Sequence, residues 1–238
     1  MTENFAAFCI PTTSRGLDIK DITESPLFQV VLRTLKIDSL GHHLKDVKFY
    51  IGYDFDDPIF NNQEQRDKLK DYNISWLSVN VEKGHVTEIW NRLGRKAIED
   101  GFEYLYILGD DILFENKPFL EPWIAKLKKQ NNLGWVAGFS GNNRIPTQFF
   151  IHKTHYDIFN YIYHPMIKNW WCDDFMNELY PQKYRQWDKD IQHLNVGGEP
   201  RYEIKDAQRL YKLLIQREKK KYYSYVNACK NKNVSTDI

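Results

Sequence analysis

Two adjacent carboxylates, Asp110 and Asp111, follow an apolar run over 104–108 that is short enough to be a buried strand. Burying two like charges side by side is unfavourable unless a cation or a proton compensates them. Acids at the carboxyl end of such a strand therefore indicate a divalent metal bound to oxygen ligands. A solvated turn after the strand is the alternative from these residues alone.

A second pair of carboxylates, Asp173 and Asp174, follows Trp170 and Trp171 and opens a predicted helix over 173–180. Negative charges suit the first turn of a helix, so capping alone is one interpretation. The other is an acceptor site, where a sugar packs on an aromatic ring while a carboxylate deprotonates its hydroxyl. On that interpretation we expect Asp174 to be the base, with Asp173 as second choice, and the tryptophans to contact the acceptor.

Two polar loops follow other predicted strands, over 11–16 and 54–57. The first has hydroxyl side chains and an arginine suited to a diphosphate, although an ordinary turn is the alternative. It has neither the Gly-x-x-x-x-Gly-Lys nor the Gly-x-Gly-x-x-Gly pattern, which disfavours kinase-like NTPases and dehydrogenases. A metal on Asp111, with or without Asp110 as a second ligand, could hold the phosphates and stabilise a departing diphosphate, as nucleotide-sugar transfer requires.

The elements that must position these residues alternate between strand and helix. Apolar runs predict strands over 6–10, 47–53, 74–81 and 104–112. Helical spacing predicts helices over 27–35, about 61–72 and 85–100. This order predicts parallel strands with helices packed on both faces. Ligands bind outside the carboxyl ends of such strands, so the loops should converge on one pocket.

The second half of the chain has a more mixed pattern. We expect a helix over 118–130, strands over 135–139 and from 148, and a loop over 140–146. A basic amphipathic helix is expected from 204 to about 225, followed by a frayed polar end over 230–238. Its run of three lysines, 219–221, is either a solvated helix face or a weak contact to a membrane surface or phosphate.

Composition limits the classes of protein that fit. With 238 residues, 42% of them hydrophobic, we expect one domain over 1–238: a nucleotide-binding half to about 115, an acceptor-side half over 116–200, and a C-terminal helix and tail over 201–238. Lys and Arg total 33 against 32 Asp and Glu, which does not favour a nucleic-acid partner. Without an apolar run of membrane-helix length, and with a polar start unlike a signal peptide, we expect a soluble, cytoplasmic protein. Three scattered cysteines predict reduced, non-catalytic thiols.

Several blocks of the sequence together resemble the small GT-A glycosyltransferases of chloroviruses and other giant viruses. The similarity covers roughly residues 5 to 195, in order. The blocks are Cys9-Ile10-Pro11-Thr12-Thr13-Ser14-Arg15, Tyr50-Ile51-Gly52-Tyr53-Asp54-Phe55-Asp56-Asp57-Pro58, Gly84-His85-Val86-Thr87, Gly109-Asp110-Asp111-Ile112 and Trp171-Cys172-Asp173-Asp174.

The resemblance implies the Rossmann-like GT-A fold of nucleotide-diphospho-sugar transferases, a mixed and mostly parallel sheet flanked by helices. It also implies a UDP-sugar donor and Mn²⁺ or Mg²⁺. Gly109-Asp110-Asp111 stands where the family has Asp-x-Asp, and glycine at the first place leaves Asp111 as the direct metal ligand. Asp110 would then contact the donor sugar or ribose.

The resemblance also implies further donor contacts. Thr12 and Arg15, with Pro11 and Thr13 beside them, would contact the nucleotide, and Asp54 or Asp57 the uracil or ribose. The stretch from His85 to Asn91 would form the donor-side wall. His193 resembles the late histidine that completes the metal shell in many GT-A enzymes, with a surface or packed imidazole as the alternative.

These observations predict a metal-dependent glycosyltransferase that moves a sugar from a UDP-type donor to a hydroxyl of a glycan or glycoprotein, with inversion. If the chain is viral, the host cytoplasm is its expected location. One alternative is a catalytically silent sugar-nucleotide or glycan-binding domain. A sugar nucleotidyltransferase is the other, although it normally needs a glycine-rich, basic first loop and 11–16 has one glycine and one arginine.

Overall fold

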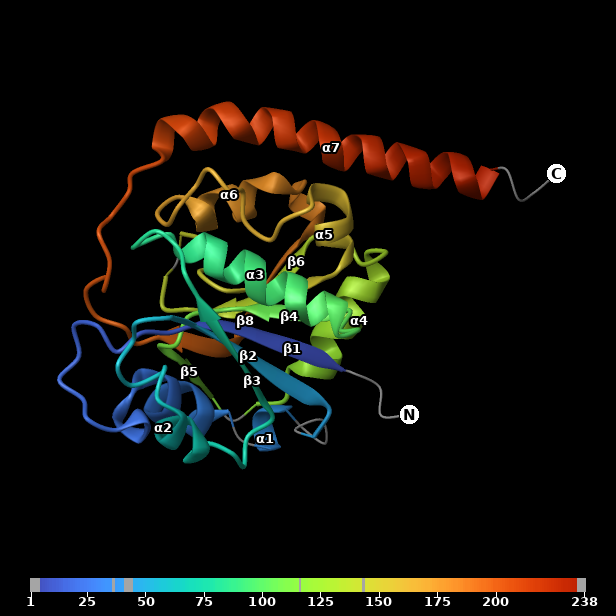
Figure 1. The fold of residues 1–238 in the computed structure, drawn as a ribbon. Helices are drawn as coiled ribbons and strands as arrows, with labels where there is room; N and C mark the ends of the chain where they lie inside the picture. The colour runs from blue at the N-terminus through green and yellow to red at the C-terminus, as the bar shows by residue number, and fades with distance from the viewer. Residues whose placement is uncertain (1–4, 36, 41–44, 116, 143, 235–238) are drawn as a thin grey trace.

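The structure is a computed structural model that describes residues 5–35, 37–40, 45–115, 117–142 and 144–234. The polar start at 1–4 and the last part of the predicted tail, 235–238, lie outside these residues. Within them an eight-stranded sheet forms the centre of the molecule, in the order β3-β2-β1-β4-β7-β6-β8-β5 (Figure 1).

Four parallel strands make up the first half of the sheet, as predicted: β1 (Ala6–Pro11), β2 (Val47–Asp54), β3 (Ile74–Val79) and β4 (Tyr104–Ile107). The second half is mixed. β7 (Phe149–His152) runs antiparallel to both β4 and β6 (Trp135–Phe139), while β8 (Arg185–Asn195) runs parallel to β6. β5 (Ile112–Phe114) completes the sheet antiparallel to β8.

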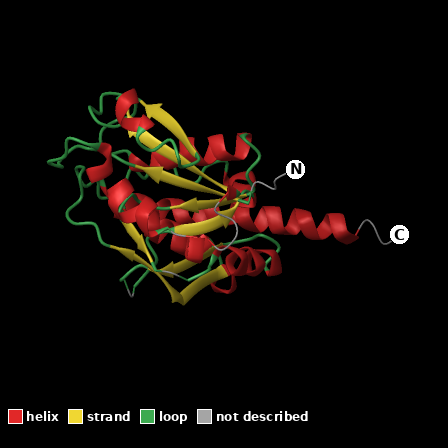
Figure 2. Cartoon of the chain, turned by 90° about the horizontal axis from the view of Figure 1, so that it is seen from below, coloured by secondary structure: helices red, strands yellow, loops and turns green. Residues whose placement is uncertain are grey.

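Helices cover both faces of the sheet, which confirms that prediction (Figures 1 and 2). On one face the core contains residues of α3 (Val86–Glu99), α5 (Thr154–Phe159), α6 (Cys172–Leu179) and α7 (Gln208–Val234). On the other it contains residues of η2 (Leu27–Leu32), α1 (Ile37–Leu40) and α4 (Leu120–Lys129). The short elements η1 (Ile22–Glu24), α2 (Gln63–Asp67) and η4 (Gln182–Tyr184) lie in connections. Neighbouring residues of one strand, such as Cys9 and Ile10, belong to opposite cores because side chains alternate along a strand.

Close packing fixes the helix that follows β3. Ile89 and Leu93 of α3 lie over β2, where Gly52 leaves room for them: a Cβ atom at Gly52 would lie 2.5 Å from Ile89. The start of α3 is thereby held beside the carboxyl ends of β1 and β2.

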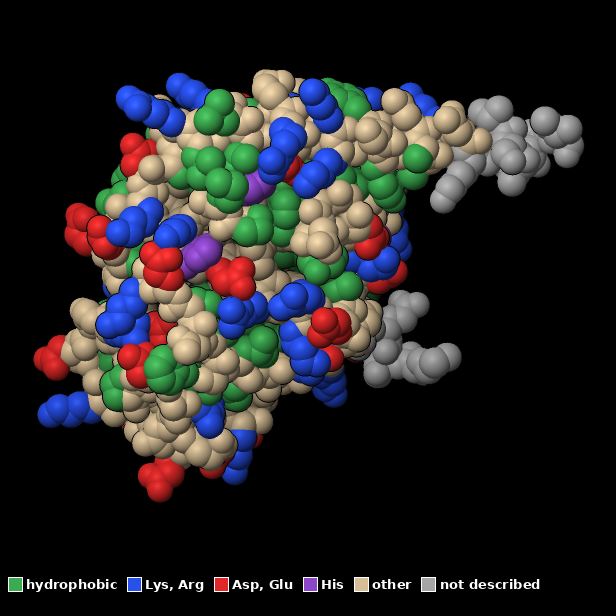
Figure 3. All heavy atoms as spheres, turned by 45° about the horizontal axis from the view of Figure 1, so that its top comes forward, with side chains coloured by type: hydrophobic (Ala, Val, Ile, Leu, Met, Phe, Trp, Pro, Cys, Tyr) green, Lys and Arg blue, Asp and Glu red, His purple; other side chains and the backbone are tan. Residues whose placement is uncertain are grey.

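Several expectations about the second half were wrong. The polar strand β8 was not predicted, and Ile112 begins β5 instead of ending the strand before it. β8 lacks an apolar run because most of its side chains are partly or fully exposed. α7 starts later than expected and continues to Val234, so residues 230–234 are helical instead of frayed. Among the described residues, no helix has the length and apolar composition of a membrane span. On the face drawn in Figure 3, acidic and basic side chains are interspersed.

Candidate active site

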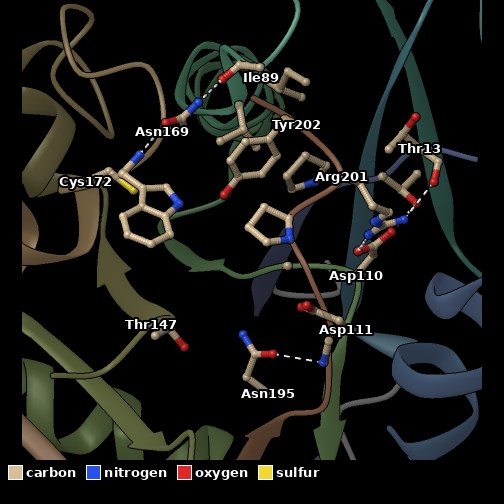
Figure 4. Close-up of a pocket in the computed structure, with 18 of the residues that line it drawn as sticks. Thr13, Ile89, Asp110, Asp111, Thr147, Asn169, Cys172, Asn195, Arg201 and Tyr202 are labelled. Carbon is tan, nitrogen blue, oxygen red and sulfur yellow. Dashed lines mark hydrogen bonds and ion pairs between the residues drawn. The ribbon is translucent and has the colours of Figure 1, made fainter. Parts of the chain in front are cut away.

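A cavity of about 1070 Å³ opens at the carboxyl ends of β1, β2 and β4, where the sequence predicts it. Its volume lies just above the usual range for small-molecule sites, about 300–1,000 Å³. Most of the predicted site residues line it, and Figure 4 shows three of them, Thr13, Asp110 and Asp111. The predicted residues in the lining are Pro11, Thr12, Thr13, Arg15, Asp54, His85, Asp110, Asp111, Trp170, Trp171, Asp173 and Asp174.

Asp57, a predicted donor contact, does not line the cavity but shapes the loop after β1. Its side chain is buried and accepts hydrogen bonds from Thr13 Oγ1 (3.1 Å) and from the backbone N–H and hydroxyl of Ser14 (2.7 and 2.8 Å). Backbone N–H groups of Ile59 and Phe60 donate to the same carboxylate. Asp57 therefore supports the loop that faces the cavity.

Arg15 of the same loop pairs with the carboxylates of Asp54, the last residue of β2, and of Asp56, just after the strand. Burial raises the pKa of Asp54 despite this partner. The planar guanidinium joins two loops at the rim of the cavity.

Asp110 is buried, and both of its oxygens have partners. Thr12 Oγ1 donates to one oxygen at 2.6 Å, and the guanidinium of Arg201 pairs with the other. Arg201 also donates to the carbonyl oxygen of Thr13 at 2.8 Å, so it joins Asp110 to the first loop (Figure 4). These contacts compensate the charge of Asp110.

The carboxylate of Asp111 faces the cavity between two glycines. Burial and the neighbouring Asp110 carboxylate raise the pKa of Asp111 to about 6. Side chains at Gly109 or Gly197 would fill the space that its oxygens occupy. The two glycines leave space for the carboxylate oxygens of Asp111, and the raised pKa indicates that their negative charge is poorly compensated. Such a carboxylate suits Mg²⁺ or Mn²⁺, which bind oxygen ligands.

No cluster of three or more His, Cys, Asp or Glu that could hold a metal occurs among the described residues. Magnesium sites in phosphate-transferring enzymes commonly use one or two carboxylates, with water and substrate phosphates as the remaining ligands. Asp111 fits that kind of site, and not a closed protein cage.

The predicted acceptor side lies across the cavity, at the start of α6. Both oxygens of Asp174 accept hydrogen bonds from the guanidinium of Arg144, at 2.7 and 3.3 Å. Asp173 accepts a weak hydrogen bond from the thiol of Cys172, with sulfur and oxygen 3.7 Å apart. Burial raises the pKa of Asp173 to about 7.

The two tryptophans before α6 differ in their surroundings. Trp171 has a positive φ of 74° and stacks on Tyr211 of α7, with ring centroids 5.7 Å apart. Trp170 is 46% exposed at the cavity. An exposed ring beside carboxylates is a suitable face for a sugar.

On the donor-side wall, His85 precedes α3 and lines the cavity. Its Nε2 atom is buried without a hydrogen-bond partner among the described residues. Asn91, six residues further along the chain, does not line the cavity. Its side-chain oxygen accepts hydrogen bonds from the backbone N–H groups of Ile162 (2.8 Å) and Tyr163 (2.9 Å), so Asn91 fixes the segment after α5.

His193, the expected second metal ligand, is not brought to the cavity. It is fully buried on β8 opposite Phe114, and its Nδ1 lies 2.7 Å from the hydroxyl oxygen of Tyr106. Rings of Phe114, Phe119 and Trp123 pack around it, and burial lowers its pKa to about 3. The packed imidazole that the sequence left as the alternative describes its position.

Sequence reasoning missed the segment 196–207, which connects β8 to α7 and contributes Arg201 and Tyr202 to the cavity. Asn169 holds this segment by donating to the carbonyl of Glu203 at 3.0 Å and accepting from the N–H of Lys205 at 2.9 Å. One signal was available, because an irregular connection of this length is usually functional. Arg144 carried no comparable signal.

The fold is similar to solved structures at low sequence identity. S. aureus TarS 1–349 in complex with UDP-GlcNAc aligns with a TM-score of 0.59 and 14% identity, over 90% of this chain and 66% of that chain. A longer S. aureus TarS structure aligns with a TM-score of 0.56 and 12% identity, over 79% of this chain and 36% of that chain. The mannosyltransferase PcManGT from Pyrobaculum calidifontis, in complex with GDP-Man and Mn²⁺, aligns with a TM-score of 0.53 and 10% identity, over 82% of this chain and 58% of that chain.

The chain thus spans less than two thirds of the length of these proteins. No protein-family model matches the sequence, and no curated protein matches it. The likeness establishes the fold, a GT-A arrangement with a mixed, mostly parallel sheet flanked by helices. Nothing in it links the chain to chloroviruses or giant viruses.

Proposed function

We propose that this protein is a metal-dependent glycosyltransferase that transfers a sugar from a UDP-type donor to a hydroxyl of a glycan or glycoprotein. The observation that carries the proposal is one cavity with Asp111 on the wall after β4 and Asp173 on the wall at α6. The GT-A fold supports it, as do the UDP-GlcNAc in TarS and the GDP-Man and Mn²⁺ in PcManGT.

On the donor side, Asp111 would hold Mn²⁺ or Mg²⁺, which when bound stabilises negative charge on the departing diphosphate. Thr12, Thr13 and Arg15 would hold the nucleotide, and the unpartnered Nε2 of His85 offers a further polar contact in the same wall. Arg201, paired with Asp110, also lines this end of the cavity, and its planar fork suits phosphate oxygens.

On the acceptor side, we propose Asp173 as the base, ahead of Asp174. Arg144 already occupies both oxygens of Asp174, whereas Asp173 has one weak donor and a pKa raised to about 7 by burial. A base is most effective when its pKa lies near the working pH. Trp170 would support the acceptor sugar through its exposed ring.

The reaction we propose is a single displacement with inversion. The acceptor oxygen forms a bond to the anomeric carbon on the face opposite the diphosphate, and its proton passes to Asp173. The bond from the anomeric carbon to the phosphate oxygen breaks, and its electron pair leaves with the nucleoside diphosphate.

A screen of nucleotide sugars with and without Mn²⁺ tests this proposal. Calorimetric titration measures binding, and a coupled assay measures released nucleoside diphosphate. We expect at least one UDP-sugar to bind and to release UDP only when Mn²⁺ is present. Binding without release would instead support a silent sugar-nucleotide-binding domain, and formation of a nucleotide sugar from a sugar phosphate and UTP would support a nucleotidyltransferase.

A further inference from the structure

The carboxylate of Asp111 fits between two glycines that are far apart in the sequence. Gly109 lies in the loop after β4, and Gly197 follows β8. A Cβ atom at Gly109 would lie 2.6 Å from Asp111 Oδ1, closer than real Cβ contacts, and one at Gly197 would overlap Asp111 Oδ2. Each oxygen therefore occupies the space that a side chain would fill.

Backbone conformation does not explain these glycines. Neither Gly109 nor Gly197 is among the residues with positive φ, where glycine is favoured. The neighbouring Gly198 has nothing within 4 Å of its Cβ position among the described residues. The requirement at 109 and 197 is consequently for space beside one carboxylate.

Hydrogen bonds keep Gly197 at this place. The backbone N–H of Val196 donates to the carbonyl oxygen of Asp111 at 3.0 Å, and the N–H of Gly197 donates to the side-chain oxygen of Asn195 at 3.0 Å (Figure 4). The end of β8 is thus fixed against the residue whose carboxylate it confines.

We propose that Gly109 and Gly197 are positioning residues that set the direction in which Asp111 presents its carboxylate to the metal and the donor diphosphate. The inference rests on the proposed function for the identity of that ligand. This inference also explains why the first position of the acidic motif is glycine. A side chain at position 109 would displace the carboxylate of Asp111, the metal ligand at the third position. An aspartate introduced at 109 should therefore weaken the metal site instead of restoring a second ligand.

The first experiment needs no metal. The carbon-13 chemical shift of Asp111 Cγ is compared in the wild type and in Gly109→Ala, Gly197→Ala and Gly198→Ala. We expect the resonance to move in the first two variants and to stay in place in Gly198→Ala. The nearest atoms to the new methyl group in Gly109→Ala belong to Asp111 itself, so this variant should unfold at nearly the wild-type temperature. An unchanged Asp111 resonance in folded Gly109→Ala would overturn the inference.

The second experiment measures Mn²⁺ affinity by electron paramagnetic resonance in the presence of UDP. We expect Gly109→Ala, Gly109→Asp and Gly197→Ala to bind Mn²⁺ about tenfold more weakly, or worse, and Gly198→Ala to match the wild type. Tighter binding by Gly109→Asp would contradict the inference. A wild type that binds no Mn²⁺ would instead contradict the metal in the proposed function, while the carbon-13 comparison still decides the role of the glycines.

Discussion

Asp173 and Asp174 are adjacent in the sequence, but only one of them is free to accept a proton. Arg144 donates two hydrogen bonds to Asp174. Substitution of Asp174 should therefore change the position of the loop that carries Arg144 more than it changes the chemistry. We expect Asp173→Asn to lower kcat by about a hundredfold or more, as loss of a general base commonly does. Asp174→Asn is the matched control and should lower kcat less than tenfold. A larger loss of kcat in Asp174→Asn than in Asp173→Asn would indicate that Asp174 is the base.

The same carboxylate predicts a pH profile. Asp173 accepts a proton only in its ionised form, and burial raises its pKa to about 7. The value of kcat/KM should therefore rise about tenfold per pH unit below this pKa and level off above it. Asp173→Asn should remove that limb of the profile from the residual activity. If the wild-type kcat/KM did not change between about pH 5 and pH 8, Asp173 would not be the base.

At the scale of elements, Arg201 holds the 196–207 segment in place at the donor side of the cavity. Its guanidinium contacts the carboxylate of Asp110 and the carbonyl of Thr13, while Asn169 holds the next part of the segment. In Arg201→Ala we expect faster amide hydrogen exchange over 196–203 and unchanged exchange in β1 and β2. Arg201→Lys keeps the charge without the planar fork and should give an intermediate result. Unchanged exchange in Arg201→Ala would show that Arg201 does not hold the segment.

The elements also explain how much the sequence revealed. Strands β1, β2 and β4 are runs of apolar residues because both of their faces are covered, so their pattern and the convergence of their loops were predictable. β8 carries many polar residues and was not recognised. Because β8 was not recognised, the positions of His193 and Gly197 could not be predicted. His193 lies in the core opposite Phe114, and Gly197, which follows β8, lies beside Asp111.

At the scale of the whole molecule, buried histidines make stability depend on pH, and His155 and His193 are the most deeply buried of those described. Burial lowers the pKa of His155 to about 4 and that of His193 to about 3, below the value of about 6.5 in an unfolded chain. The unfolded chain then binds more protons, so each histidine favours folding above about pH 6.5 and loses that contribution as the pH falls towards its folded-state pKa. Asp111 and Asp173, whose pKa values are raised on folding, act in the opposite direction.

A difference measurement isolates one histidine. His193→Gln keeps a hydrogen-bonding side chain near Tyr106 but cannot titrate. The variant should be less stable than the wild type at pH 7.5, and the gap should narrow by about 1.4 kcal/mol per pH unit between about pH 6 and 4. Denaturant unfolding across this range measures the gap. A gap that does not change with pH would mean that His193 is not buried as a neutral ring.

The central claim is that Asp111 holds the metal on which donor cleavage depends. The most direct test is the rate of Mn²⁺-dependent UDP release from a UDP-sugar by the wild type, Asp111→Ala and Asp111→Asn, with a circular dichroism spectrum to check folding. We expect both variants to fold and to lose about a hundredfold or more of the Mn²⁺-dependent rate, because the metal's stabilisation of the leaving diphosphate is lost. Mn²⁺-dependent UDP release by Asp111→Ala at the wild-type rate would contradict the claim.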